Sequence, residues 1–215
     1  MDVFEALKAH RYPIGLKGEK ARQMLLLLRN YGAELREKHP DNFVSFVWFG
    51  GPTRGHGSFK DLDYGVVGRG LTEEFLQEIH EGLAEKIKPL HLEPCLSYNA
   101  KNRYFDLNPE REFPFVDLDN AHLPFGLMVA PAKLREEAQR EVVKFVLSLP
   151  DPEGMWARVR RNHDDFVMPD PDKPGNSSRF KGLEAERAWL EAGVTGARKR
   201  FELPPLPEMR RRFNL

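Results

Sequence analysis

The chain has 215 residues, with 33 basic and 33 acidic side chains, so its formal net charge at pH 7 is zero. A chain of this length can bury a core without metals or disulfides. Its charge balance excludes a global positive field that would hold it non-specifically on nucleic acid or anionic membranes. The single cysteine, Cys95, cannot form an internal disulfide, and residues 1–10 lack the pattern of a signal peptide, so we expect a cytoplasmic protein. The apolar runs are also too short for a membrane-spanning helix, which needs roughly 20 residues.

The first half of the chain is predicted to contain two helices and two strands. Helix formers with regularly spaced apolar residues favour a helix that ends before Pro40. An aromatic, β-branched run leads into Gly50 and Gly51, which favours a buried strand that ends in a sharp turn. Thr72 is followed by two glutamates and is typical of a helix N-cap. In order, we expect a helix, a strand, a strand and a helix over residues 18–40, 42–49, 62–67 and 72–87.

Short strands and then helices are predicted for the second half. Turn residues separate three strand candidates, over residues 91–98, 103–107 and 113–118. Beyond Ala130 we expect helices over residues 131–149, 152–165 and 178–191. Residues 201–215 contain too many prolines for regular structure, so we expect them to wrap over the body or to stay mobile. The predicted fold class is α/β (α+β), with a small mixed sheet flanked by helices.

Two aspartates on one strand candidate carry the strongest chemical signal. Side chains two apart on a strand point to the same face, so Asp61 and Asp63 project together while Leu62 and Tyr64 turn to the other side. Two adjacent carboxylates repel each other unless a cation lies between them, and their oxygen atoms suit Mg²⁺. The spacing therefore predicts a metal site at Asp61 and Asp63.

The loop before these aspartates suits phosphate binding. Gly50 and Gly51 lack Cβ atoms, so their backbone N–H groups can approach a phosphate closely. Arg54 and Lys60 can neutralise phosphate charge, and Ser58 can donate a hydroxyl hydrogen bond. We therefore expect a metal and a triphosphate to meet at one place.

Ten residues of this segment resemble a known family. They form a strand end, a glycine turn, an Arg-Gly loop and an Asp-x-Asp strand: Phe49, Gly50, Gly51, Thr53, Arg54, Gly55, Ser58, Asp61, Leu62 and Asp63. This pattern resembles the nucleotidyltransferase fold of the DNA polymerase β superfamily, and the order of the predicted elements fits loosely as far as Leu118. The resemblance implies a small mixed sheet with helices on one side. It also implies two Mg²⁺ ions held by three carboxylates, and a nucleotide bound by Gly50, Gly51, Thr53, Arg54, Ser58 and Lys60.

The resemblance further implies a reaction. A nucleoside monophosphate would be transferred from an NTP substrate to a hydroxyl acceptor, with release of pyrophosphate. A pair of metal ions suits this chemistry, because one can activate the attacking oxygen while the other stabilises the leaving oxygen.

Three residues compete for the third carboxylate that the resemblance implies. Glu93 lies on the first strand candidate after the helix, which is the expected position, although Pro94 follows it directly. Asp106 and Asp117 lie in strand-like contexts later in the chain. We prefer Glu93, together with Asp61 and Asp63, as a catalytic and metal-binding residue.

Other conspicuous residues have structural interpretations. Arg158, Arg160 and Arg161 on a predicted helix are typical of a solvated face. Trp48 and Trp156 fall in apolar contexts, so we expect them in the core.

The sequence as a whole predicts a nucleotidyltransferase-like domain with N-terminal helices over residues 1–125. A helical region with a proline-rich tail would follow over residues 126–215. Two alternatives to an ATP-binding or other NTP-binding transferase stay open. One is a catalytically silent nucleotide- or partner-binding module, such as one component of a toxin–antitoxin pair, and the other is an enzyme that adds nucleotides to an RNA end. A small molecule, an RNA end and a protein side chain all stay open as acceptors.

Overall fold

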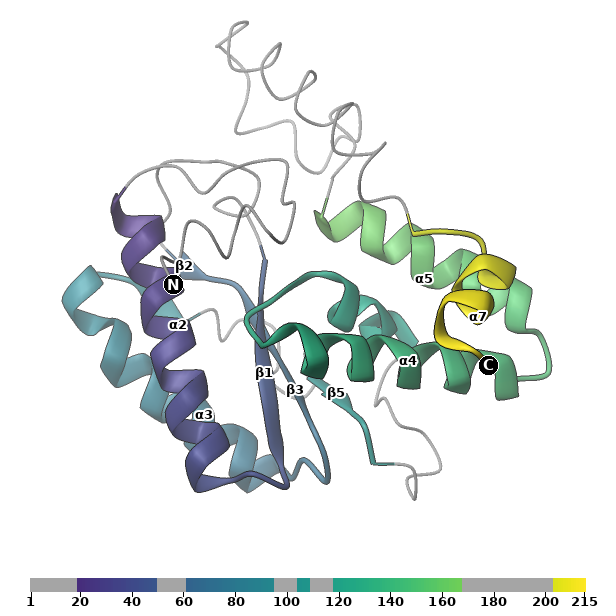
Figure 1. Cartoon of the computed structure of the whole chain (residues 1–215). Helices are drawn as coiled ribbons and strands as arrows, with labels where there is room; N and C mark the ends of the chain where they lie inside the picture. Colours follow the sequence, from purple (N-terminus) through teal and green to yellow (C-terminus); the bar gives the residue numbers. More distant parts are fainter. Residues whose placement is uncertain (1–18, 50–60, 95–103, 109–117, 168–202) are drawn as a thin grey trace, which may run out of the picture.

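The computed structural model describes residues 19–49, 61–94, 104–108, 118–167 and 203–215. Over these residues the fold is mixed α/β, with a small four-stranded sheet between two groups of helices (Figure 1). In chain order the elements are α2 (Glu19–Lys38), β1 (Phe43–Trp48), β2 (Asp61–Leu62), β3 (Tyr64–Gly68), α3 (Glu73–Ile87), the 3-10 helix η2 (Lys88–Leu90), β4 (Glu93–Pro94), β5 (Tyr104–Asp106), the 3-10 helix η4 (Leu118–Phe125), β6 (Leu127–Met128), α4 (Ala132–Ser148), α5 (Pro152–Val167) and α7 (Leu206–Phe213).

The four-stranded sheet has the strand order β5-β3-β1-β6, so β1 and β3 are its central strands. β1 runs antiparallel to both β3 and β6, whereas β3 and β5 run parallel. A separate parallel pair joins β2 to β4. Because parallel strands need a long crossover, the helix α3 between β3 and β4 is what allows both parallel pairs to form.

Most of the predicted elements are confirmed. α2, β1, α3, α4 and α5 lie close to their expected bounds, and Thr72 caps α3 by accepting a hydrogen bond from the Phe75 backbone N–H at 3.2 Å. The strand expected over 62–67 is divided at Asp63 into β2 and β3. β4 and β5 lie within two of the later strand candidates. Leu118 begins a 3-10 helix instead of ending a strand, and residues 113–117 and 178–191 lie outside the described residues.

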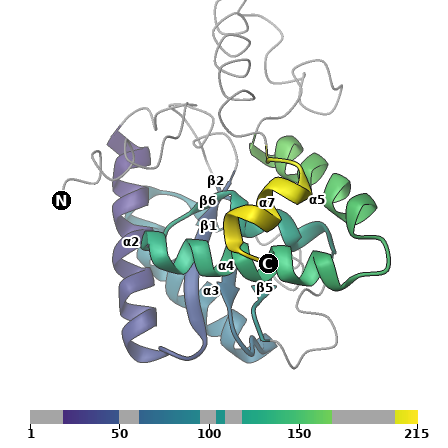
Figure 2. The same ribbon diagram turned by 45° about the vertical axis from the view of Figure 1, so that its right-hand side comes forward.

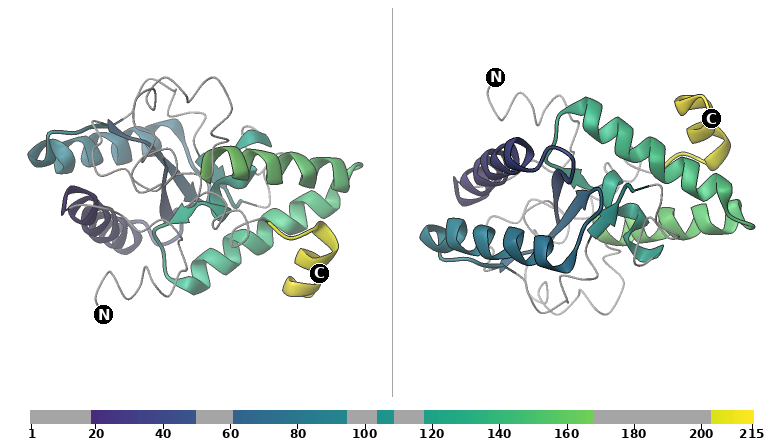
Figure 3. Two further views of the ribbon diagram at one scale, coloured as in Figure 1. Left: turned by 90° about the horizontal axis from the view of Figure 1, so that it is seen from above. Right: turned by 90° about the horizontal axis from the view of Figure 1, so that it is seen from below.

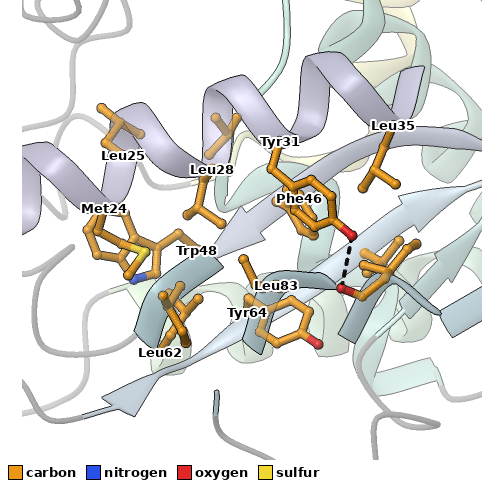
Figure 4. Packing of buried hydrophobic residues seen from close by; sticks show 14 of the residues in the cluster. Met24, Leu25, Leu28, Tyr31, Leu35, Phe46, Trp48, Leu62, Tyr64 and Leu83 are labelled. Carbon is orange, nitrogen blue, oxygen red and sulfur yellow. Dashed lines mark hydrogen bonds between the residues drawn. The ribbon is translucent and has the colours of Figure 1, made fainter. Parts of the chain in front are cut away.

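Helices α2 and α3 cover one face of the sheet. Apolar residues spaced three or four apart along α2, including Met24, Leu28 and Tyr31, form a continuous buried stripe. They pack with Phe46 and Trp48 of β1 and with residues of β2, β3 and α3 in one core cluster (Figure 4). α2 is therefore held by tertiary packing of its apolar face, since isolated helices are marginal in water.

A β-bulge at the start of β1 lets both faces of this strand be apolar. Phe43 and Ser45 pair with successive residues of β3, so Val44 is the extra residue between them. The Val44 carbonyl, displaced from the regular ladder, accepts a hydrogen bond of 3.0 Å from Arg36 Nη1 of α2. The bulge shifts the alternation by one residue, so Phe43 and Phe46 both face α2 and α3.

The second group of helices, η4, α4, α5 and α7, covers the opposite face. Val44, Val47 and Phe49 pack there with side chains from these helices in a second core cluster. In Figure 3 the purple and blue helices α2 and α3 lie on one side of the strands, and the green α4 and α5 lie on the other. The expectation of helices on one side only is therefore wrong. Helices are needed on both sides because both faces of β1 carry apolar side chains that must be covered.

The two regions predicted from the sequence, residues 1–125 and 126–215, share this second core. β6 lies beyond the expected boundary and pairs with β1, with Val47 opposite Met128 and Trp48 opposite Leu127. An ion pair between Arg69, which follows β3, and Glu137 of α4 also joins the two regions.

The C-terminal tail contains regular structure, which corrects the expectation drawn from its prolines. Pro205 and Pro207 lie at the N-cap and in the first turn of α7, where a missing backbone N–H breaks no helical hydrogen bond. Leu206 and Met209 on one side of the helix are buried. The tail does wrap over the body, as expected, because α7 packs against α4 (Figure 2).

Replacing Gly82 of α3 with alanine should destabilise the protein. A Cβ there would overlap the Tyr31 hydroxyl and lie 2.9 Å from Tyr31 Cζ, and Tyr31 is buried and donates a 3.4 Å hydrogen bond to the Ile79 carbonyl (Figure 4). Overpacking of this kind costs about 1–3 kcal/mol, which outweighs the gain of about 1 kcal/mol in helix propensity. Urea unfolding measures the difference.

Gly32→Ala in α2 is the matched control, because a Cβ there would meet its nearest atom at an ordinary 3.5 Å. This control should be neutral or stabilising. Equal gains in stability for both variants would contradict the packing of Tyr31 against Gly82.

Candidate functional site

Asp61 and Asp63 alternate with buried residues, as the strand pattern predicts. Both aspartates are partly exposed, whereas Leu62 and Tyr64 are buried in the core beneath α2 and α3. Since side chains alternate along a strand, the two carboxylates belong to the opposite side of the chain from that core. Burial of Leu62 and Tyr64 therefore determines which side of the chain Asp61 and Asp63 face.

The backbone of Glu93 lies directly beside that of Asp61. β2 and β4 run parallel with Asp61 paired to Glu93 and Leu62 paired to Pro94. Paired strands lie about 4.8 Å apart, so two of the three predicted carboxylate-bearing residues occupy neighbouring register positions. Among the described residues β4 pairs only with β2, so Pro94 lies in an edge strand, where proline is tolerated.

The residue that follows β1, Phe49, lies beside Asp63. The Phe49 backbone N–H donates a 2.9 Å hydrogen bond to the Asp63 carbonyl. Gly50 follows Phe49 directly in the chain, so the glycine pair begins one residue from this contact. Pairing of β1 with the chain of β2 and β3 thus joins the start of the predicted phosphate loop to the Asp-x-Asp strand.

Asp106, one of the three candidates for the third carboxylate, lies at the wrong end of the sheet. It pairs with Gly68 at the far end of β3, about 16 Å along the strand from Asp63 at roughly 3.3 Å per residue. Its buried carboxylate accepts hydrogen bonds of 2.9 Å from the backbone N–H groups of Gly70, Leu71 and Asn108. Asp106 therefore organises the turn after β3, where Gly70 has a positive φ of 60°.

Several predicted site residues lie outside the described residues. These are the glycine pair, the four polar loop residues and the last carboxylate candidate: Gly50, Gly51, Thr53, Arg54, Ser58, Lys60 and Asp117. Among the side chains that the structure describes, no three His, Cys, Asp or Glu residues form a group that could hold a metal ion. The described part of the predicted metal site thus consists of the side chains of Asp61 and Asp63 and the backbone position of Glu93.

A buried hydrogen bond between Tyr64 and His80 lies behind the aspartates, and the sequence analysis missed it. Tyr64 Oη and His80 Nδ1 are 2.7 Å apart. Because Tyr64 follows Asp63 directly, this bond holds the chain next to the aspartates against α3. Burial lowers the pKa of His80, and the nearby charge of Glu81 only partly opposes that effect. A signal was present in the sequence, because His80 lies four residues after Leu76 and three before Leu83 on the apolar face of α3.

The predicted arginine-bearing helix is confirmed as α5, where Arg158 and Arg161 are exposed. Trp48 and Trp156 are buried, as expected for core residues.

Comparisons with known proteins gave no result that places the chain in a family. Neither the models of protein families, nor the curated proteins, nor the solved structures that were searched contain a match. None of the helices in the described ranges has both the length and the apolar character needed to cross a membrane. The resemblance to nucleotidyltransferases therefore rests on the sequence motif.

Acidification should destabilise the protein partly through His80. Because burial lowers its pKa in the folded state, the unfolded chain takes up a proton first as the pH falls through the unfolded value of about 6.5. Stability due to neutral His80 is thus present above that pH and is lost as the pH falls toward the lower, folded pKa. The measurement is the free energy of unfolding between pH 8 and pH 5 for the wild type and for His80→Gln.

The wild type should lose more stability over this interval than the variant does. Parallel curves for the two proteins would show that His80 does not remain neutral in the folded state.

Asp106→Asn should lower the free energy of unfolding by about 1–3 kcal/mol, since an amide cannot replace a carboxylate as acceptor for three backbone N–H groups without leaving buried donors unpaired. Asp41→Asn, an exposed change in the turn before β1, serves as the control and should be neutral. A thermal melt that is identical for both variants would contradict the structural role of Asp106.

Proposed function

We propose that this protein is a Mg²⁺-dependent nucleotidyltransferase that transfers a nucleoside monophosphate from an NTP to a hydroxyl acceptor and releases pyrophosphate. Asp61, Asp63 and Glu93 are the proposed metal-binding residues. The backbone of Gly50 and Gly51, with Thr53, Arg54, Ser58 and Lys60, is the proposed triphosphate site. The observation that carries this proposal is the meeting of three chain segments: Phe49 is hydrogen-bonded to Asp63, and Asp61 is paired with Glu93.

The arrangement of strands supports a nucleotidyltransferase-like fold. β1 and β3 form an antiparallel pair; Gly50 and Gly51 come soon after β1 in the chain, and the two aspartates come just before β3. α3 then crosses to β4, which brings Glu93 back beside Asp61. This order of elements is the one that the resemblance implies for the third carboxylate, and it favours Glu93 over Asp106.

The donor set suits hard divalent cations. Carboxylate oxygens are preferred ligands of Mg²⁺, and neighbouring carboxylates such as those of Asp61 and Asp63 would repel each other without a cation. Bound Mg²⁺ would supply charge neutralisation for the phosphates and activation of the acceptor oxygen. The protein's own contribution is positional. The strand pairs hold the backbone of Asp61, Asp63 and Glu93 beside Phe49, and the core fixes which way Asp61 and Asp63 face.

Removing either aspartate should abolish transfer without unfolding the protein. We expect Asp61→Asn and Asp63→Asn to reduce the transfer rate by about a thousandfold or more, since metal-ion catalysis contributes several kcal/mol to the barrier. The thermal melting temperature should stay unchanged or rise, because one of two mutually repelling charges is removed. The assay uses each NTP labelled at its α-phosphate, with Mg²⁺ and a cell extract as the source of acceptors.

The design includes matched controls for charge and residue type. Asp41→Asn removes an exposed aspartate before the opposite end of β1, and Glu85→Gln removes an exposed glutamate of α3. Both controls should keep full activity. Wild-type activity in Asp61→Asn would refute the proposal, whereas Mg²⁺-dependent ATP binding by a wild type that labels no acceptor would favour the silent binding module.

A further inference from the structure

The C-terminal segment, residues 203–215, packs on the rest of the protein mainly through apolar side chains. Leu203, Leu206 and Met209 recur every third residue, and all three are buried in the second core cluster. Between them, Pro205, Pro207 and Glu208 are exposed, and Pro204 is half-buried. An apolar stripe at helical spacing with a polar outer side is the pattern of a peptide helix that docks on a complementary surface.

The receiving surface is built by α4 and α5. α7 packs directly on α4, and Trp156 Nε1 of α5 donates a 2.8 Å hydrogen bond to the Pro204 carbonyl. Trp156 is itself buried, and its ring packs edge-on against Phe125 of η4 at a centroid distance of 5.7 Å. The surface is therefore supported from beneath by the core, and it presents an indole N–H to a backbone carbonyl.

The segment provides most of its own end-capping. Pro205 precedes the helix and its carbonyl accepts hydrogen bonds from the Glu208 and Met209 N–H groups. At the other end, Asn214 adopts a left-handed conformation and its N–H bonds back to the last turn of α7. The Leu215 N–H and carbonyl both bond to Arg210. A segment whose helix ends are satisfied internally needs few polar groups on the surface to which it docks.

The sequence distance across this contact is large. Trp156 and Pro204 are 48 positions apart in the chain, so the hydrogen bond between them is not imposed by a short connection. The position of the segment is instead set by its contacts with α4 and α5.

We propose that the surface of α4 and α5 is a peptide-binding site and that residues 203–215 are its resident ligand, bound in cis. Its ligand class is an amphipathic peptide with apolar residues at every third position, a proline at the helix N-cap and a free carbonyl for Trp156. The same segment supplied as a separate peptide binds the site once the resident copy has left. This inference is independent of the nucleotidyltransferase proposal, because it involves neither Asp61 nor Asp63.

The test starts from the full-length folded protein. A specific protease site is introduced between residues 168 and 202, and the chain is cleaved after folding. Gel filtration at low concentration then separates the released fragment from the body, and circular dichroism records whether the body stays folded. A dye-labelled peptide of residues 203–215 is titrated back and its anisotropy is followed.

The released body should stay folded and bind the labelled peptide, and excess unlabelled peptide should displace it. A peptide carrying Leu206→Ala and Met209→Ala should bind on the order of 100-fold more weakly, since two buried anchors are lost. The matched control with Glu208→Ala and Arg211→Ala changes only exposed residues and should bind within about threefold of the original.

Three results would overturn the inference. One is a body that unfolds when the fragment leaves, and another is a fragment that neither dissociates nor exchanges with labelled peptide. The third is equal binding of the peptide that lacks both apolar anchors. The first two would identify α7 as an inseparable part of the second core, and the third would show that binding does not depend on the apolar stripe.

Discussion

The burial of β1 on both faces is the constraint on which the rest of the structure depends. Every residue of this strand is buried, and its alternate side chains enter two different core clusters. A strand of this kind cannot lie at an edge or under a single layer of helices, so the chain must supply helices for both sides. The bulge at Val44, with its carbonyl bonded to Arg36, is the local adjustment that keeps both sets of apolar residues facing inward. Phe49, which follows β1, is hydrogen-bonded to Asp63, so the strand that organises the two cores also reaches the candidate site.

Much of this architecture could be predicted because local signals agreed with the final fold. The stripe of α2, the aromatic character of β1 and the Thr72 cap of α3 are short-range features, and each was confirmed. The helix α7 was missed because prolines were counted without regard to position, although a proline at the first turn of a helix is favourable. The covering of the second face was missed for a different reason. Apart from Ser45, the run of residues 43–49 is apolar on both faces. Such a strand predicts two covered faces, but only if this pattern is given more weight than the resemblance.

For the candidate site, the sequence specified the pair of aspartates but not their surroundings. The alternation of Asp61 and Asp63 with Leu62 and Tyr64 follows directly from strand geometry. The choice between Glu93 and Asp106 depended on pairing between strands, which is long-range and invisible in local pattern. The register settles the location of both residues: Glu93 is beside Asp61, while Asp106 is bonded to the turn after β3 at the other end. The contact between Tyr64 and His80 is also long-range, although the place of His80 on the apolar side of α3 pointed to its burial.

The order in which the two faces of β1 are covered has a consequence during synthesis. α2 and α3, which cover the first face, lie within residues 19–87, on either side of β1 and β3 in the chain. Val44, Val47 and Phe49 on the second face wait for η4, α4 and α5, which begin at Leu118 and end at Val167. At roughly 5–20 residues per second, a ribosome needs about 4–16 s to translate from the end of α3 to the end of α5. For that interval the nascent chain carries a sheet with one bare apolar side, which makes it a natural client for chaperones that bind exposed hydrophobic surface.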